Sequence, residues 1–309
     1  SYGAGAAYAP DAIIEASTQL DFHDPLAPGA WRRGIATADV DYSLQEASQR
    51  LRTDAARVID HLEGGGSPDD EYVVRKVRRV NEGCAAMNAN IESQAARWLD
   101  AGRIVGLVGG DHSTPYGLIR ALGARHAEFG ILHIDAHCDL RDAYEGFEFS
   151  HASIMFNVLR DVPQAVRIAQ VGVRDFSEGE AALAASSERI ATFDDLSLAA
   201  ARFRGETWDE QCRRIVGTLP REVYVSFDID GLTFENCPHT GTPVSGGLTF
   251  NEAVWLLAVL ARSGRRIIGF DVVEVCPAPD QRIDAITGAR ILWKLCGLTL
   301  ASNAEKAGK

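Results

Sequence analysis

The chain has 309 residues, of which 46% are hydrophobic and 24% are charged, as is typical of a globular protein. Its net charge of −12 and the lack of any basic run argue against nucleic acid as a partner. No apolar stretch reaches the roughly 18 residues that span a membrane. The six cysteines form no CxxC pair, so we expect them to be reduced in a cytoplasmic protein.

Helical and strand patterns alternate along most of the chain. Two long amphipathic helices are predicted at 43–62 and 71–101, joined by the loop-forming sequence GGGSPDD. Short runs rich in Val and Ile predict strands buried on both faces, at 104–108, 130–134, 166–173, 222–227 and 265–273. Further helices are predicted at 115–126, 153–160, 178–187, 208–219, 251–262 and 284–300. This order predicts a mainly parallel sheet between two helical layers, a three-layer α/β/α fold in one domain over 1–309.

Polar residues follow four of these strands. They are Asp111 and His112, the DAHCD stretch at 135–139, Asp228 and Asp230, and Glu274. A single Asp or His at a loop start is usually a cap or a satisfied polar residue. In open parallel sheets, however, ligands bind at the carboxyl ends of the strands, where these residues meet. Because buried carboxylates are costly without a counter-charge, this grouping predicts a cation site.

The DAHCD stretch indicates which residues face the cation. On an extended backbone Asp135, His137 and Asp139 share one side, and Cys138 faces the other. Oxygen-rich ligands with one or two imidazoles suit a hard or borderline divalent ion such as Mn²⁺. The carboxylates outnumber the needs of one ion, so the pattern predicts two ions that share aspartates.

The polar segments, taken in order, resemble the ureohydrolase family, which includes arginases, agmatinases, guanidinobutyrases and formimidoylglutamases. The matching segments are GGDHS (109–113), DAHCD (135–139), FSHAS (149–153), SFDID (226–230) and DVVEV (271–275). The opening SYGAGAAYAPDAIIEAS is a weaker match, to a glycine-rich loop and helix that follow a first strand in relatives. We therefore expect a few residues to precede Ser1.

The resemblance implies a binuclear manganese centre, with Ni²⁺ or another divalent ion as the alternative. The residues matched to one ion are His112, Asp135, Asp139 and Asp228, and those matched to the other are His137, Asp135, Asp228 and Asp230. Asp135 and Asp228 would bridge the two ions. The resemblance also implies a homo-oligomer, commonly a trimer or a hexamer.

The expected reaction is hydrolysis of a guanidino compound to urea and an amine. Two divalent ions lower the pKa of a shared water and so supply hydroxide at neutral pH. By resemblance, Glu274 holds the guanidinium and His151 is the proton-shuttling histidine. Asp230 is placed to pass the hydroxide proton to the leaving amine, and a histidine that titrates near neutrality suits proton return from solvent.

Two departures from the family pattern bear on the substrate. Thr233 and Phe234 replace an Asp-Pro pair, which affects the shape of a loop and no ligand. Ser177 stands where arginases have an acid for the substrate α-amino group, and DAYEGFEF at 142–149 lacks their Ser/Asn-rich character. Because an α-amino acid leaves costly unpaired charges in such a site, arginine is disfavoured.

The acids of the 142–148 loop favour an agmatine-like substrate. Asp142, Glu145 and Glu148 suit a free ammonium group, although a solvated surface loop explains them equally well. Arg141 and Arg174 are available for the carboxylates of formimidoylglutamate. Guanidinobutyrate, guanidine and arginine stay open as alternative substrates.

Two other classes of protein fit part of the pattern. A metal-dependent deacylase on a related fold typically has paired histidines and a tyrosine near one zinc, whereas this set is richer in aspartate. A non-catalytic metal-binding protein would not need every ligand position and His151, all of which are present.

Overall fold

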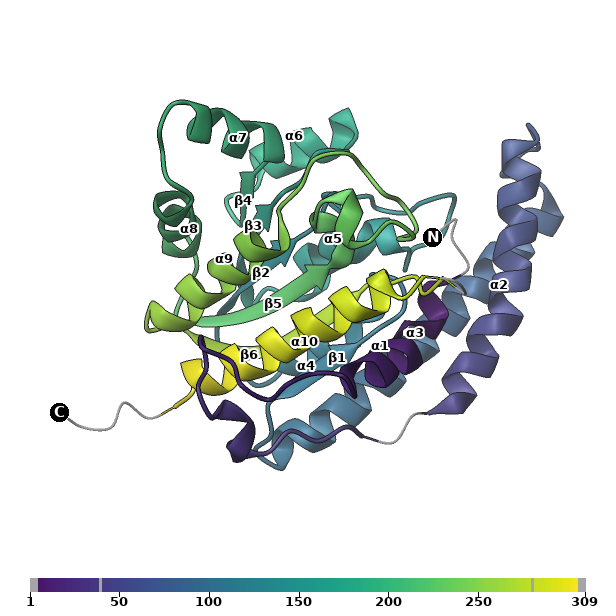
Figure 1. The fold of residues 1–309 in the computed structure, drawn as a ribbon. Coiled ribbons are helices and arrows are strands. Elements are labelled where there is room, and N and C mark those ends of the chain that lie inside the picture. Colours follow the sequence, from purple (N-terminus) through teal and green to yellow (C-terminus); the bar gives the residue numbers. More distant parts are fainter. Residues whose placement is uncertain (1–4, 39–40, 279–280, 305–309) are drawn as a thin grey trace.

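The computed structural model describes residues 5–38, 41–278 and 281–304, and its centre is one sheet of six parallel strands (Figure 1). The strand order is β1-β6-β5-β2-β3-β4. The strands are β1 (Val105–Val108), β2 (Phe129–Ile134), β3 (Ala165–Val171), β4 (Ile190–Phe193), β5 (Glu222–Asp228) and β6 (Arg266–Val273). The predicted mainly parallel sheet is therefore confirmed.

Helices cover both faces of the sheet, which confirms the predicted three layers (Figure 1). One core cluster includes residues of α1 (Ala9–Ser17), α7 (Asp195–Phe203), α8 (Trp208–Gly217), α9 (Phe250–Arg262) and α10 (Ile283–Ser302). The cluster on the other face includes residues of α3 (Glu71–Asp100), α4 (Tyr116–Gly123), α5 (Ile154–Asp161) and α6 (Glu178–Ser186). No helix in the described part of the chain is both long and apolar enough to cross a membrane.

The remaining helices lie at the margins of these layers. Helix α2 (Tyr42–Glu63) packs along α3, and the GGGSPDD turn joins them as predicted. The short 3₁₀ helices are η1 (Ala6–Tyr8), η2 (Ala30–Arg33), η3 (His151–Ser153), η4 (Ile229–Gly231) and η5 (Phe234–Asn236). Residues 1–4 of the SYGAG match lie outside the described residues, and η1 and α1 supply the helix expected after it. The single domain over 1–309 stays a prediction.

Three features differ from the sequence-based expectation. Strand β4 and helix α7 were not predicted, because both are short and lie in a region without a strong apolar period. Strand β1 is not buried on both faces, since it lies at the edge of the sheet and Gly106 is exposed. The next three strands in the sheet, β6, β5 and β2, are the buried strands at its centre. The four strands followed by polar motifs are thus contiguous in the sheet.

Candidate metal centre

The loop after β1 is held against the end of β6. The backbone N–H of Gly109 donates to the carbonyl of Val272 at 3.0 Å, and that of Glu274 donates to the carbonyl of Gly110 at 2.8 Å. These bonds extend the β1–β6 pairing beyond the strands and place His112 beside Glu274. The polar residues after two separate strands are therefore brought together, as the sequence predicts.

Three carboxylates surround the His112 imidazole. Its Nδ1 lies 2.9 Å from Asp135 Oδ2, 3.0 Å from Asp139 Oδ2 and 3.3 Å from Asp228 Oδ2. All four residues are at most 3% exposed. Within the described parts of the chain, this buried nitrogen has no partner in hydrogen-bond geometry. One nitrogen and three carboxylate oxygens that converge in this way suit the coordination of a cation better than hydrogen bonds among themselves.

A second cluster adjoins the first. His137 Nδ1 lies 3.1 Å from Asp230 Oδ2 and 3.4 Å from Asp135 Oδ1. The buried Oδ2 of Asp230 has no hydrogen-bond partner among residues 5–38, 41–278 and 281–304. Asp135 therefore turns one oxygen to each cluster, which is the arrangement of a carboxylate shared by two ions. Asp228, also matched to the second ion, faces His112 through Oδ2, and its Oδ1 accepts the backbone N–H of Asp230 at 2.8 Å.

The chain reaches this arrangement without the extended backbone predicted for DAHCD. Strand β2 ends at Ile134, and Asp139 has φ +54°, a left-handed value that non-glycine residues adopt rarely. The carbonyl of Asp139 accepts from Met155 and Phe156 at the start of α5, both at 3.1 Å. The extended geometry is thus wrong at Asp139, and Cys138 is buried in a hydrophobic core cluster.

A close backbone approach brings the ends of β5 and β2 together. A Cβ on Gly231 would lie 2.8 Å from the backbone nitrogen of Asp135, a distance that real Cβ atoms do not adopt. The absent side chain lets the Asp228–Asp230 turn reach Asp135. The backbone N–H of Ala136 also donates to Asp230 Oδ1 at 3.0 Å.

The electrostatics of the cluster call for positive charge. Burial raises the pKa of Asp228 well above its usual range, and Asp230 and Asp135 add to the effect. Burial and the charge of Asp135 raise the pKa of Asp139 to about 6. Burial alone would lower the pKa of His137, but Asp135 and Asp230 raise it to about 12. The carboxylates thus repel one another and stabilise any cation between them, which is the behaviour of a divalent metal site.

His133 is a site residue that the sequence analysis missed. It is fully buried, and its Nε2 lies 2.8 Å from Asp135 Oδ2. Gln170 Nε2 lies 3.5 Å from the other ring nitrogen and donates to the carbonyl of Cys138 at 2.7 Å. The sequence signal for His133 was its spacing of two residues from Asp135, because residues two apart on a strand face the same side. His133 can orient Asp135 or act as a ligand itself.

Glu274 lies next to these clusters in an uncommon conformation. Its φ is +60°, and it is 3% exposed. Oε1 accepts the backbone N–H of His112 at 3.0 Å, while Oε2 is buried without a hydrogen-bond partner among the residues described. Burial and the nearby charge of Asp111 raise the pKa of Glu274 to about 8. An aligned cationic ligand would satisfy the open oxygen and favour the charged form.

His151 lies at the start of η3, with the ring of Tyr144 edge-on at 6.1 Å. Burial lowers the pKa of His151 to about 3, so its imidazole is neutral at neutral pH. This differs from the near-neutral titration expected for a proton shuttle. Asp111, the remaining acid of the GGDHS loop, accepts from the N–H and hydroxyl of Ser113 and shapes the turn.

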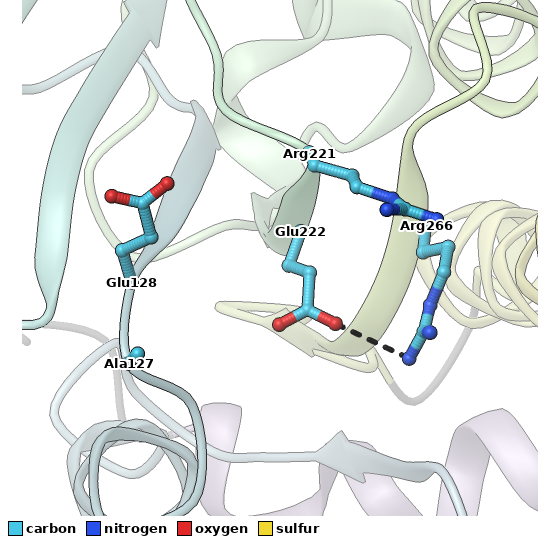
Figure 2. Close-up of a pocket in the computed structure, with 5 residues that line it drawn as sticks. All are labelled: Ala127, Glu128, Arg221, Glu222 and Arg266. Carbon is cyan, nitrogen blue, oxygen red and sulfur yellow. Dashed lines mark ion pairs between the residues drawn. The ribbon is translucent and has the colours of Figure 1, made fainter.

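Two hollows lie outside the clusters. One of about 310 Å³ lies at the starts of β5 and β6, the opposite edge of the sheet, and Figure 2 shows the Glu222–Arg266 ion pair across it. Another of about 760 Å³ lies between helix α3 and the loop that contains Glu145 and Phe149. The departures at Thr233 and Phe234 fall at η5, where Phe234 is exposed.

The model of the arginase family matches residues 1–297. The chain belongs to the arginase family. It is 33% identical over 208 residues to the N(1)-aminopropylagmatine ureohydrolase of Thermus thermophilus, a match that covers 67% of each protein. It is 32% identical over 224 residues to the agmatinase of Cronobacter sakazakii, covering 71% of this chain and 67% of the relative.

Solved structures of agmatinases share the fold. The agmatine ureohydrolase of Thermoplasma volcanium superposes with a TM-score of 0.70 at 21% identity, over 97% of this chain and 86% of that one. A hypothetical agmatinase from Burkholderia thailandensis gives a TM-score of 0.56 at 30% identity, over 69% of this chain and 64% of its own. Membership of the arginase family confirms the resemblance and the enzyme class, a hydrolase acting on C–N bonds that converts a guanidino compound to urea and an amine. The family implies a binuclear divalent metal centre, and the two His/Asp clusters fit it.

Proposed function

We propose that the chain hydrolyses a guanidino amine of the agmatine type with two Mn²⁺ ions. The choice of substrate rests on the contacts that Arg141 and Arg174, two cationic residues of the neighbouring loops, make within the protein. Arg174 is bound to backbone carbonyls and Arg141 lies against Glu180 and Tyr144, which disfavours both as partners of a substrate carboxylate. The similarity to an agmatinase and to an aminopropylagmatine ureohydrolase supports the same class of substrate.

Arg174 is committed to the backbone. Its guanidinium donates to the carbonyls of Asp230 at 2.6 Å, Gly172 at 2.9 Å and Val244 at 3.0 Å. It therefore acts as a clamp on the Asp228–Asp230 turn, and to turn toward a substrate it would have to break these bonds. A site for formimidoylglutamate or a guanidino acid needs a cation that is free to bind a carboxylate.

Arg141 and Ser177 are likewise occupied by neighbours. The Nε of Arg141 lies 3.5 Å from Glu180 Oε2, and its guanidinium covers the Tyr144 ring at 4.8 Å. The Ser177 hydroxyl caps α6, donating to Glu180 Oε2 at 2.8 Å and accepting the N–H of Glu180. Neither the α-carboxylate nor the α-amino group of arginine has a dedicated partner here.

Glu145 is the acid proposed for the substrate ammonium. It has φ +53°, and its Oε2 is buried without a hydrogen-bond partner in the described ranges of the chain. The adjacent Tyr144 ring packs on His151, which connects this loop to the proposed catalytic residues. A carboxylate oxygen left without a donor suits the N–H groups of an ammonium ion.

The proposed ligand sets follow the two clusters. One ion is assigned to His112, Asp135, Asp139 and Asp228, and the other to His137, Asp135, Asp228 and Asp230. The oxygen-rich donors favour Mn²⁺, and Ni²⁺ is the main alternative. When bound, the pair of ions lowers the pKa of water enough to supply hydroxide at neutral pH. Assembly as a trimer or hexamer and a cytoplasmic location stay predictions from the sequence.

Two protein groups of the proposed mechanism, Glu274 and Asp230, have a buried oxygen without a hydrogen-bond partner in the described ranges of the chain. Glu274 Oε2 accepts the guanidinium N–H groups, because Oε1 is already bonded to His112. Asp230, a proposed ligand whose Oδ1 accepts the N–H of Ala136, would also accept a proton from the attacking water and pass it to the leaving amine. His151 is the residue proposed to relay a proton from solvent.

A urea-release assay tests this proposal. Protein loaded with Mn²⁺ or, separately, Ni²⁺ is given agmatine, guanidinobutyrate, arginine, guanidine and formimidoylglutamate, with formamide measured for the last. We expect the highest kcat/KM with agmatine and Mn²⁺. A higher value for a guanidino acid rejects the assignment of the substrate. One tightly held zinc with amide hydrolysis would support a deacylase, and a metal-loaded protein inert to all compounds would support a binding protein.

A further inference from the structure

The loop at 237–240 follows β5 in the chain and contacts the residues at the ends of both β5 and β6. The Cys237 thiol donates to the carbonyl of Ile229 at 3.0 Å, between the proposed ligands Asp228 and Asp230. The Thr240 hydroxyl donates to the carbonyl of Glu274 at 2.9 Å. The position of this loop is therefore coupled to both strand ends on which the proposed reaction depends.

His239 anchors the same loop to helix α10. Its backbone N–H donates to Asp284 Oδ1 at 3.0 Å, and its ring Nδ1 lies 2.7 Å from Asp284 Oδ2. Asp284 is the second residue of α10 and is fully buried, whereas the His239 side chain is 35% exposed. A carboxylate accepts hydrogen bonds only, so the ring proton lies on Nδ1. His239 thus contacts both carboxylate oxygens of the buried Asp284.

An acid in the first turn of a helix usually stabilises the helix end through its dipole or by capping. Asp284 instead directs both oxygens to His239, and Arg282, the residue before α10, forms no side-chain capping bond to the described residues. A buried carboxylate is costly unless its hydrogen bonds are fully made. Among the described residues, the hydrogen bonds that offset this cost come from His239, and they fix the loop.

We propose that the His239–Asp284 pair positions Glu274 for guanidinium binding. The inference rests on the proposed function, in which Glu274 binds the guanidinium. The backbone of Glu274 is left-handed, a conformation that persists only where the surroundings hold it. Gly110, His112 and Thr240 supply the three hydrogen bonds that do so. Loss of the His239 anchor frees the Thr240 end and lets the carboxylate turn away.

The test compares His239→Ala, His239→Asn and Thr240→Val with the wild type. Asn places its Nδ2 near the position of the histidine Nδ1, so it keeps the bond to Asp284 without a titrating group. His126→Ala is the matched control, because His126 forms a similar pair with Glu222, 2.6 Å apart, at the opposite edge of the sheet. Each variant is measured for KM and kcat with agmatine, for bound manganese and for Tm.

We expect His239→Ala and Thr240→Val to raise KM about tenfold, as for loss of one hydrogen bond near a charge, with little change in kcat. Metal content stays at the wild-type value, His239→Asn restores KM to within about threefold, and the control leaves KM unchanged. An unchanged KM in His239→Ala overturns the inference. A fall in kcat that Asn does not rescue also overturns it, because it would assign proton transfer to His239.

Calorimetric binding of guanidinium ion to the manganese-loaded protein separates this inference from the proposed function. If the wild type releases no urea but His239→Ala weakens guanidinium binding, the reaction is wrong and the positioning role holds. If the wild type releases urea and guanidinium binding is equal in both proteins, the reaction holds and the positioning role is wrong. A wild type that neither turns over nor binds guanidinium rejects both.

Discussion

The backbone N–H of His112 donates to Glu274 Oε1 at 3.0 Å across 162 residues of sequence. The side chain of the same histidine faces Asp135, Asp139 and Asp228. One residue therefore fixes both the metal cluster and the acid proposed for the substrate. Any shift of the loop after β1 therefore moves both the His/Asp cluster and Glu274. Variants that distinguish metal binding from substrate binding must change a side chain that takes part in only one of them.

Asp135→Asn and His137→Ala should lose metal and activity together. Asp135 turns an oxygen to each cluster, and His137 supplies the only imidazole of the second cluster within the described residues. Metal binding needs these deprotonated ligands. Metal content by mass spectrometry and urea release are the measurements. Asp142→Asn, at an exposed acid of the nearby loop, is the control. Full metal content and rate in both variants would reject the ligand assignment.

Glu274→Gln should keep both ions but lose guanidinium binding. The neutral amide removes the charge that would face the guanidinium while keeping the size of the side chain. We expect kcat/KM to fall at least about 100-fold, since a charge-assisted pair is lost in a buried site. Glu148→Gln, an exposed acid, is the control. If kcat/KM is unchanged, Glu274 does not bind the substrate.

His133→Asn should weaken metal binding without removing an ion. In this prediction His133 orients Asp135 through its 2.8 Å contact and is not itself a ligand. Loss of a residue that orients a ligand typically costs about 10–100-fold in metal affinity. Titration of the metal-free protein with Mn²⁺ should give two ions at saturation, at higher free metal. A stoichiometry of one would show that His133 is a ligand.

Glu145→Gln should stabilise the protein at pH 8 but not at pH 4. Burial and the charge of Glu63 raise the pKa of Glu145 in the folded protein. Between the unfolded and folded pKa values the folded state holds more protons, so stability falls as pH rises through this window. Gln carries no charge and avoids that loss. Tm measured against pH for both proteins checks the sign, and a gain that is larger at pH 4 contradicts it.

The same substitution should weaken agmatine binding if Glu145 contacts the ammonium. KM for agmatine should rise, whereas KM for guanidine, which has no ammonium tail, should stay the same. Asp142→Asn serves again as the control in the same loop. Equal KM values for agmatine in wild type and Glu145→Gln would leave 142–148 as a solvated surface loop.

The grouping of the ligands was predictable because acids and histidines directly follow runs of Val and Ile. The position of Asp135 at the end of β2 follows from that pattern and from the parallel sheet. His133 was not found, because inside an apolar run a histidine resembles any other buried strand residue. The turn at Asp139 depends on the N–H groups of α5, which lie in a different segment. Local periodicity carries no information about such partners.

The contact between His239 and Asp284 could not be predicted from the sequence for a related reason. In sequence it marks only the start of a helix, and His239 lies in a loop without regular period. Their pairing is a property of the fold, which brings the start of α10 beside the loop that follows η5. Likewise, Arg174 was expected to be available to a substrate, and only its contacts with the carbonyls of Gly172, Asp230 and Val244 show it to be engaged.

The order of the strands also affects how the protein is made. Among the strands of the described residues, β1 pairs with β6 alone, so that Val105 lies beside Gly269. On the ribosome, the segment of β1 and the GGDHS loop emerges long before its partner strand exists. His112 therefore cannot reach Asp135 in the final geometry until β6 has been synthesised and inserted between β1 and β5. Binding of metal ions by the full proposed ligand set would therefore follow the synthesis of β6.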